Sequence, residues 1–131
     1  MKKRHLALAL LCLLALLAGC GGQGPLADGT YTIEVTLSGG SGRASVDSPA
    51  RLTVQGNTCT ATITWSSPHY EYMLVDGVRY EPIQEQGNAA AFAIPVVLDT
   101  DMAVSASTVA MGQPHLIDYT LHFSSASIQG E

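Results

Sequence analysis

The sequence predicts an all-β fold, an antiparallel sandwich or barrel of about seven or eight strands. Three observations lead to this prediction. Apolar residues recur at every second position in several segments, which is the signature of a strand with one buried face. Turn-forming residues separate these segments at short intervals. No segment after residue 25 shows an apolar stripe at helical spacing.

The first half of this domain contains three groups of alternating apolar positions. Residues 38–42, Ser-Gly-Gly-Ser-Gly, break the first group, and residues 55–57, Gln-Gly-Asn, close the second. The third group, residues 59–65, is the clearest strand because it is rich in β-branched residues. The positions expected to face the core are Tyr31, Ile33, Val35, Leu37, Ala44, Val46, Leu52, Val54, Cys59, Ala61, Ile63 and Trp65.

The second half opens with the strongest hairpin signal of the chain. Asp76-Gly77 supplies two residues that tolerate positive φ, as a type I′ turn requires, so Val75 should pair with Val78. Three further strands are expected around residues 92–94, 102–106 and 117–123, the first of them closed by proline.

Residues 1–19 are predicted to be a lipoprotein signal peptide. Basic residues at positions 2–4 precede an uncharged apolar run, residues 6–17, which is shorter than the ~20 residues that span a bilayer. The run ends at Leu-Ala-Gly-Cys, which resembles a lipobox and makes Cys20 the predicted lipidation site. An ordinary secretory peptide or an uncleaved anchor is the alternative.

The predicted organisation places one domain outside the cytoplasm, held on the cell membrane by its lipid. Residues 20–27 form the lipidated N-terminus and a tether, residues 28–124 the β-sandwich, and residues 125–131 a small polar C-terminal tail that should fray. Cys59 is expected to be a buried thiol without an internal disulfide, because Cys20 is assigned to the lipid.

Composition excludes some classes of function. Beyond the signal peptide, Arg43, Arg51 and Arg79 are the only basic residues besides histidine, against all 11 acidic residues. A nucleic-acid-binding surface needs clustered positive charge, so that class is disfavoured. No triad spacing, phosphate-binding loop or metal-ligand cluster is evident, and the chain is predicted not to be an enzyme.

The first candidate binding segment is residues 65–73, Trp-Ser-Ser-Pro-His-Tyr-Glu-Tyr-Met. Ser66 or Ser67 could cap a short helical turn, and Tyr70 or Tyr72 could face a ligand. The alternative is an ordinary strand connection whose tyrosines pack on the sandwich.

The second candidate segment is residues 111–119, where a Gly-Gln-Pro turn leads into the last strand. His115 and Tyr119 fall on one face of that strand, and haem iron accepts either a histidine or a tyrosine phenolate. Residues four apart on an extended strand are ~13 Å apart, so the pair would meet only across a bulge. The alternative is a core Tyr119 and a solvated His115.

These segments resemble a NEAT (near-iron transporter) domain, a surface-bound module that binds haem and passes it along an uptake chain. The resemblance covers residues 28–123. The similar stretches are DGTYTI at 28–33, TATITWSSPHYEYMLVDGV at 60–78, FAIP at 92–95 with MAV at 102–104, and HLIDYTLHF at 115–123.

The resemblance implies an immunoglobulin-like antiparallel β-sandwich that binds haem. The last stretch falls where the family has Tyr-x-x-x-Tyr, whose first tyrosine ligates ferric iron and whose second hydrogen-bonds to it. Here His115 replaces the first tyrosine, and Tyr119 corresponds to the second. The other implied pocket residues are Ser66 or Ser67 at a haem propionate, and Tyr70, Tyr72, Met111 and Ile117 along the slot.

The function predicted from the sequence is therefore a lipid-anchored haem-binding or haem-relay module that supplies a haem ABC transporter, with His115 as the favoured ligand. The first alternative is a protein-interaction module on the same scaffold, which binds a haemoprotein or a cell-surface partner through residues 66–73. A copper or other metal site using His69, His115 and Met111 is the second alternative.

Overall fold

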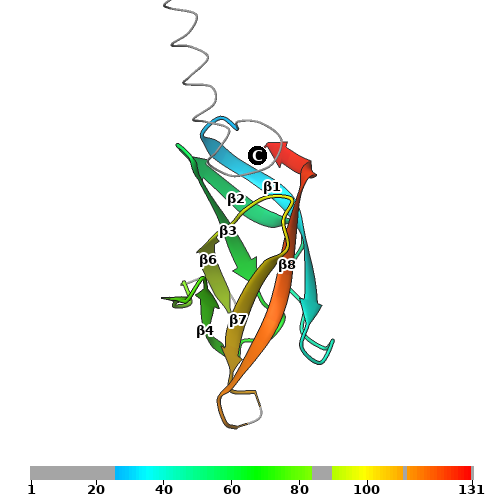
Figure 1. Cartoon of the computed structure of the whole chain (residues 1–131), viewed down its shortest axis with the longest axis vertical. Coiled ribbons are helices and arrows are strands. Elements are labelled where there is room, and N and C mark those ends of the chain that lie inside the picture. The colour runs from blue at the N-terminus through cyan, green and yellow to red at the C-terminus, as the bar shows by residue number, and fades with distance from the viewer. Residues whose placement is uncertain (1–25, 84–89, 111, 131) are drawn as a thin grey trace, which may run out of the picture.

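The computed structural model of the chain describes residues 26–83, 90–110 and 112–130. These residues contain strands and no helix, so none of them belongs to a helix that could cross a membrane. The predicted signal peptide, Cys20, Met111 and most of the predicted tether lie outside the described residues. The strands are β1 Gly29–Gly39, β2 Ala50–Gln55, β3 Thr58–Thr64, β4 Tyr70–Val75, β5 Val78–Tyr80, β6 Ala91–Pro95, β7 Met102–Thr108 and β8 His115–Gly130 (Figure 1).

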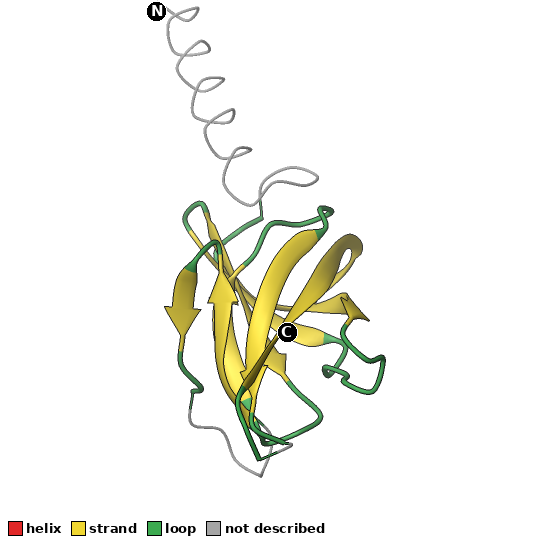
Figure 2. Ribbon diagram, turned by 60° about the horizontal axis from the view of Figure 1, so that its bottom comes forward, coloured by secondary structure: helices red, strands yellow, loops and turns green. Residues whose placement is uncertain are grey.

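All eight strands belong to one antiparallel sheet in the order β5-β4-β7-β8-β1-β2-β3-β6. The sheet folds over itself, so that its two halves face each other across the core (Figure 2). An isolated bridge between Ile83 and Ala91 brings the segment after β5 to β6, and β5 and β6 are the two ends of the strand order. The result is a nearly closed, sandwich-like fold, which confirms the predicted fold class.

Most of the core consists of alternating positions that the sequence predicted, and Val96 and Leu98 add to it from the segment after β6. Ile33, Leu52 and Ile63, from three neighbouring strands, are completely buried. Burying each such side chain contributes about 1.5–3 kcal/mol relative to exposure. Ala44 and Val46 are half-buried and pack against the core, although residues 44–46 form no strand and Val46 makes only an isolated bridge with Trp65.

The hairpin between β4 and β5 has the predicted register. Val75 pairs with Val78, and Met73 pairs with Tyr80. Asp76 and Gly77 have φ angles of 51° and 77°, as the type I′ turn requires.

The C-terminal residues are not a frayed tail. Strand β8 continues to Gly130, which pairs with Tyr31 at the start of β1. The pairing passes through a register shift at residues 32–34, where Ser127 Oγ accepts a hydrogen bond of 2.8 Å from the Glu34 backbone N–H. The Ser127 side chain thus supplies a hydrogen-bond acceptor for β1 at this irregularity.

The expectation of an unpaired thiol at Cys59 was also wrong. Cys59 is 2% exposed and disulfide-bonded. The sequence argument had excluded a disulfide only because it assigned Cys20 to a lipid. The other cysteines of the chain, Cys12 and Cys20, lie outside the described residues.

Strand β8 runs from one end of the sandwich to the other. Gly130 lies beside the beginning of β1, so the two ends of the domain are adjacent (Figure 1). His115 begins β8 at the opposite end, next to the loop that follows β7. That end, which carries both candidate segments, therefore faces away from the termini.

Candidate aromatic site at the end of the sandwich

Three aromatic side chains meet under the end of the sandwich that carries the candidate segments. The rings of Trp65 and Tyr70 are stacked, with centroids 4.2 Å apart and planes at 26°. The Tyr119 ring is tilted by 53° against Trp65, at a centroid distance of 5.0 Å. The hydroxyl oxygens of Tyr70 and Tyr119 are 2.9 Å apart and hydrogen-bonded. We call these three residues the aromatic cluster.

The strand order explains how distant residues form the aromatic cluster. Tyr70 begins β4 and Tyr119 lies in β8, and β7 runs between these two strands. A register shift in the pairing of β4 with β7 falls between Tyr70 and Tyr72. This bulge leaves Tyr70 on the buried face with Met73, whereas unbroken alternation would place Tyr70 and Tyr72 together on the face opposite Met73.

Tyr72 consequently lies on the outer face of the sheet. It is half-buried, and the Arg79 guanidinium carbon is 3.9 Å from the centroid of its ring, a cation–π arrangement. Tyr70 and Tyr72 therefore do not share a site, although the sequence offered them as equivalent pocket residues.

Burial favours the protonated form of the Tyr70 phenol. Desolvation raises the pKa of Tyr70 well above its ordinary value, and the hydrogen bond with Tyr119 raises it further. One hydroxyl donates to the other, so one phenolic proton has no acceptor among the hydrogen bonds of the described residues. The indole Nε1 of Trp65 is buried and also has no partner in the described part of the chain. The aromatic cluster thus holds polar hydrogens that its own contacts do not satisfy, and such groups are uncommon in folded proteins.

A glycine covers Tyr119 from the solvent side. Gly40 is exposed and has a φ of 65°. A Cβ atom on Gly40 would lie 2.8 Å from Tyr119 Cε1 and 3.4 Å from Ile117 Cγ2. Only a side chain as small as that of glycine lets the loop after β1 lie this closely on the tyrosine ring.

Ser66 and Ser67 form a turn rather than the expected start of a helix. The Ser45 backbone N–H donates to Ser66 Oγ at 3.2 Å, and the Ser66 N–H donates to the Ser45 carbonyl at 2.8 Å. Ser67 Oγ accepts a hydrogen bond of 3.2 Å from the His69 N–H, which closes the turn locally. The Val109 N–H then donates to the His69 carbonyl at 2.9 Å and joins this turn to the loop after β7.

His115 lies at the surface, apart from the aromatic cluster. Its backbone pairs with Thr108, which in turn pairs with Tyr70, so the three residues stand in one row across the sheet. The His115 side chain is exposed, and no hydrogen bond or ion pair involves it among the described residues. The structure therefore brings Tyr119 together with Tyr70 rather than with His115, as the separation along an extended strand implies.

The remaining candidates divide between the core and the surface. Ile117 is half-buried and packs against the core beside Gly40, whereas Met111 lies outside the described residues. Across the described ranges, no group of three or more histidine, cysteine, aspartate or glutamate side chains is placed to hold a metal ion. His69 and His115, proposed as copper ligands, therefore belong to no such group within the described residues.

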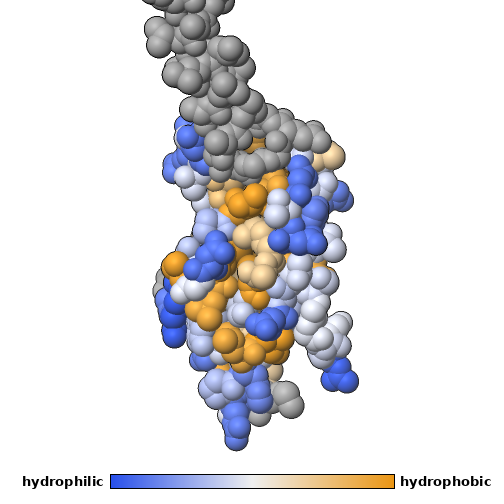
Figure 3. Space-filling model, in the orientation of Figure 1, coloured by the Kyte–Doolittle hydropathy of each residue, from blue (hydrophilic) through white to orange (hydrophobic). Residues whose placement is uncertain are grey.

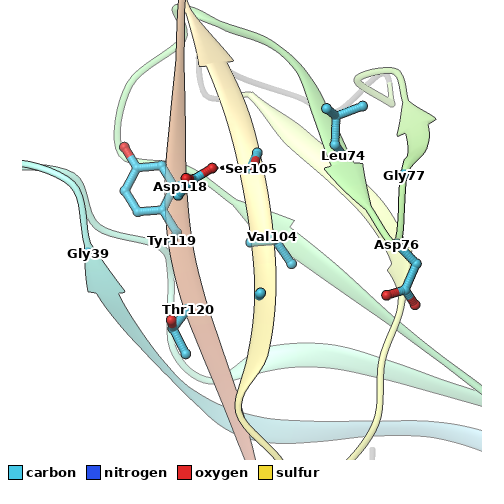
Figure 4. A pocket seen from close by; sticks show the side chains of 10 residues that line it. Gly39, Leu74, Asp76, Gly77, Val104, Ser105, Asp118, Tyr119 and Thr120 are labelled. Atoms are coloured by element: carbon cyan, nitrogen blue, oxygen red, sulfur yellow. Dashed lines mark hydrogen bonds between the residues drawn. The ribbon is translucent and has the colours of Figure 1, made fainter.

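A groove of about 500 Å³ lies nearby, between β8, β7 and the β4–β5 turn (Figure 4). Ser105 Oγ donates to Asp118 Oδ1 at 2.8 Å within it. Of the site residues predicted from the sequence, only Tyr119 contributes to its lining, and a smaller groove of about 230 Å³ beside Cys59 contains none. No pattern in the sequence predicted either groove.

Apolar surface is present on the face that carries β4, β6 and β7 (Figure 3). The exposed large apolar side chains of the described residues are Val78, Ile83, Val97 and Leu116. None of them was predicted to belong to the site.

Comparison with known proteins supports the fold. No protein-family model matches the chain, and no curated protein matches it. A solved structure described as the NEAT5 domain of IsdX2, a B. anthracis hemophore in complex with heme, is similar with a TM-score of 0.61 and 18% sequence identity. The match covers 75% of this chain and 97% of that one, so the chain has a NEAT-like fold.

Proposed function

We propose that the chain is a lipid-anchored module that binds haem and relays it to a membrane transporter for haem uptake. The observation that carries this proposal is the aromatic cluster, in which two buried tyrosine hydroxyls lie 2.9 Å apart at one end of a NEAT-like sandwich. The similar hemophore domain is described in complex with heme, which supports the same class of ligand here.

The donor set at this end of the sandwich suits haem. Imidazole and phenolate both ligate haem iron, and the two ligands predicted from the sequence, His115 and Tyr119, are of these types. Ile117 is half-buried and packs against the core that contains Trp65 and Tyr70, and a porphyrin plane needs apolar lining of this kind.

Ser66 and Ser67 are suited to a propionate. Each Oγ accepts one backbone N–H bond, which fixes the hydroxyl in place. Each hydroxyl proton is then available to donate to a carboxylate, because neither serine is a side-chain donor within the described residues. Haem is cargo in this account: the protein holds and releases it, and no bond within the porphyrin changes.

The arrangement of the ends suits a relay. The start of β1 and the end of β8 are adjacent, and the aromatic cluster lies toward the opposite end. A lipid on Cys20 would therefore hold the terminal end at the membrane and present the binding end to haem or to a donor haemoprotein. Two or three acyl chains are enough for stable attachment.

A haem titration tests the proposal. The full-length chain, purified in detergent, receives ferric haem while the Soret difference spectrum is recorded against detergent alone. We expect a saturable change that ends at one equivalent, and weaker binding of iron-free protoporphyrin, which cannot form the iron bond. A linear, unsaturated change would refute haem binding, and the protein-interaction module would become the leading hypothesis.

A further inference from the structure

We infer that the outer face of the sheet at β4, β7 and β8 docks a basic, extended segment of a partner protein, whose lysine or arginine side chains enter the groove of Figure 4. This face lies on the reverse side of the sheet from the aromatic cluster, because the exposed Asp118 alternates along β8 with the buried Tyr119. Docking here therefore goes beyond haem binding and does not depend on it.

The groove owes its depth to small side chains on its central strand. Ala103 and Ser105 of β7 lie between Leu74 on β4 and both Asp118 and Thr120 on β8. Because β4 and β8 are the two neighbours of β7, their backbones are ~10 Å apart across it. An alanine and a serine leave much of that gap open, and the groove has a volume of about 500 Å³. A long side chain of a partner can therefore lie in it.

The lining of the groove combines apolar surface with carboxylates. Leu74 and Ala103 are apolar, whereas Asp76 and Asp118 lie on opposite sides of β7 (Figure 4). No basic side chain is among the residues that line the groove. Lysine and arginine side chains have an apolar stem and a charged end, so the stem can pack on Leu74 while the charged end reaches a carboxylate. The groove thus has the chemistry that such a side chain needs.

Two serines of β7 hold carboxylates of this face in position. Ser105 Oγ donates to Asp118 Oδ1 at 2.8 Å on one side of β7, and Ser107 Oγ donates to Glu71 Oε1 at 2.9 Å on the other side. The second oxygen of each carboxylate accepts no hydrogen bond within the described residues. A guanidinium or ammonium group can bind that oxygen at a reduced cost in side-chain freedom, because the serine has already ordered the carboxylate.

The charge of this face favours a basic partner over a second copy of the chain. Arg79 lies over the Tyr72 ring and forms an ion pair with Glu81, and it does not line the groove. Asp76 and Asp118 form no ion pair among the described residues. The whole chain has 11 acidic residues against 6 lysines and arginines. A second copy or an anionic lipid surface would therefore meet like charge here, which opposes association.

The spacing of side chains on this face suits an extended segment. Tyr72, Ser107 and Leu116 are paired in a row across the three strands, next to the row of Leu74, Ser105 and Asp118. Rows on one face of a sheet are ~7 Å apart, which is also the distance between alternate side chains of an extended segment. Leu116 is 52% exposed, so a segment that runs along β7 can pack an apolar stem on it and place the next side chain in the groove.

A peptide titration tests the docking surface. The full-length chain in a neutral detergent is added to a fluorescent, acetylated Arg-Thr-Arg-Thr-Arg peptide, and fluorescence anisotropy is recorded against detergent alone. We expect saturable binding that weakens as salt is raised, because salt screens exposed charges. The matching Glu-Thr-Glu-Thr-Glu peptide should not bind. Equal binding of the two peptides would overturn the proposal.

Four variants locate the binding on the molecule. Ala103→Leu should fill the groove and abolish binding, and the fold should tolerate it because Ala103 is exposed. Asp118→Asn should weaken binding about two- to fivefold, the range of one exposed ion pair. The matched controls are Thr30→Leu and Asp47→Asn, which make the same kinds of change at exposed positions outside the groove and should bind normally. Equal losses in Asp118→Asn and Asp47→Asn, or normal binding by Ala103→Leu, would overturn the proposal.

Further readouts separate this proposal from its alternatives. The melting curve of each variant shows whether the fold is intact, and Asp118→Asn keeps the test decisive if Ala103→Leu fails to fold. Self-association of the wild-type chain that Ala103→Leu abolishes, measured by sedimentation, would overturn the basic partner in favour of a second copy. The haem titration of Ala103→Leu should match that of the wild type. An unsaturable haem titration would refute haem binding and leave the docking surface intact, whereas absent peptide binding would overturn the docking surface alone.

Discussion

The Tyr70 and Tyr119 hydroxyls form a buried hydrogen bond of 2.9 Å between residues 49 positions apart in the chain. Strand β7 separates their two strands in the sheet, so the side chains reach each other across it. Trp65 contacts both rings and joins the end of β3 to the pair. Stability and the candidate site consequently depend on the same three side chains.

The aromatic cluster should be a major contribution to stability. Trp65 is completely buried, so Trp65→Ala should cost about 3–5 kcal/mol through the lost burial and the cavity left behind. Urea denaturation followed by circular dichroism measures this cost. Leu116→Ala is the control, because Leu116 is 52% exposed and should change the free energy of unfolding little. Equal effects of the two substitutions would show that Trp65 is not a core residue.

Two glycines of the loop after β1 should respond differently to alanine. Gly40 and Gly42 both have positive φ angles, 65° and 84°, so each substitution carries a backbone cost of about 1–2 kcal/mol. At Gly40 the new Cβ would also lie 2.8 Å from Tyr119 Cε1, whereas at Gly42 it would meet nothing within 4 Å. Gly40→Ala should therefore be less stable than Gly42→Ala by a further ~1–3 kcal/mol, as overpacking costs. Equal melting temperatures would contradict the contact between Gly40 and Tyr119.

Local patterns explain why much of the fold could be predicted. The alternation that buries Ile33 and Ile63 is a property of each strand alone, and the Asp-Gly turn fixes the register of its hairpin through its own φ angles. The pattern could not show that β8 reaches Gly130, because this depends on a hydrogen bond from a distant strand to Ser127.

The site could be predicted only in part, for a different reason. Period-two alternation places Tyr70 and Tyr72 on the same face, and only the bulge separates them. Tyr119 was predicted as a candidate, but its partner comes from a strand that is not its neighbour in the sheet. The resemblance and the turn that precedes the last strand favoured His115 as the ligand, and the structure leaves that side chain in solvent.

Asp99 should make stability depend on acid pH. Its carboxylate accepts hydrogen bonds from the Ser125 hydroxyl and backbone N–H, which lower the pKa of Asp99 below its ordinary value. A lowered folded-state pKa adds stability above the unfolded pKa of ~3.9, and that stability is lost as pH falls through the folded value. The contribution is small because the carboxylate is exposed.

Asp99→Asn should therefore flatten the decline in the free energy of unfolding between about pH 5 and pH 2. Ser125→Ala should flatten it as well, and the double variant should add little, since the two side chains share one interaction. Urea denaturation at each pH measures these values. Fully additive effects of the two substitutions on the pH dependence would contradict the contact.

The proposed lipid anchor depends on the Cys20 sulfur, which is free for acylation only if Cys20 is not the disulfide partner of Cys59. Cells fed labelled palmitate should incorporate the label into the wild-type protein and into Cys59→Ser, but not into Cys20→Ser. The Cys20→Ser protein should leave the membrane fraction or remain unprocessed, because the acyl chains supply the attachment. Label that persists in Cys20→Ser would refute lipidation at this residue.

The most direct test of haem binding uses the emission of Trp65, the only tryptophan of the chain. Trp65 contacts both Tyr70 and Tyr119, so bound haem would lie close enough to quench it. Ferric haem is added stepwise to the full-length chain, with free tryptophan in the same detergent as the blank. Our account predicts that the corrected emission falls to a plateau at one equivalent, where the Soret change also ends. A decline without a plateau, indistinguishable from that of free tryptophan, would contradict haem binding.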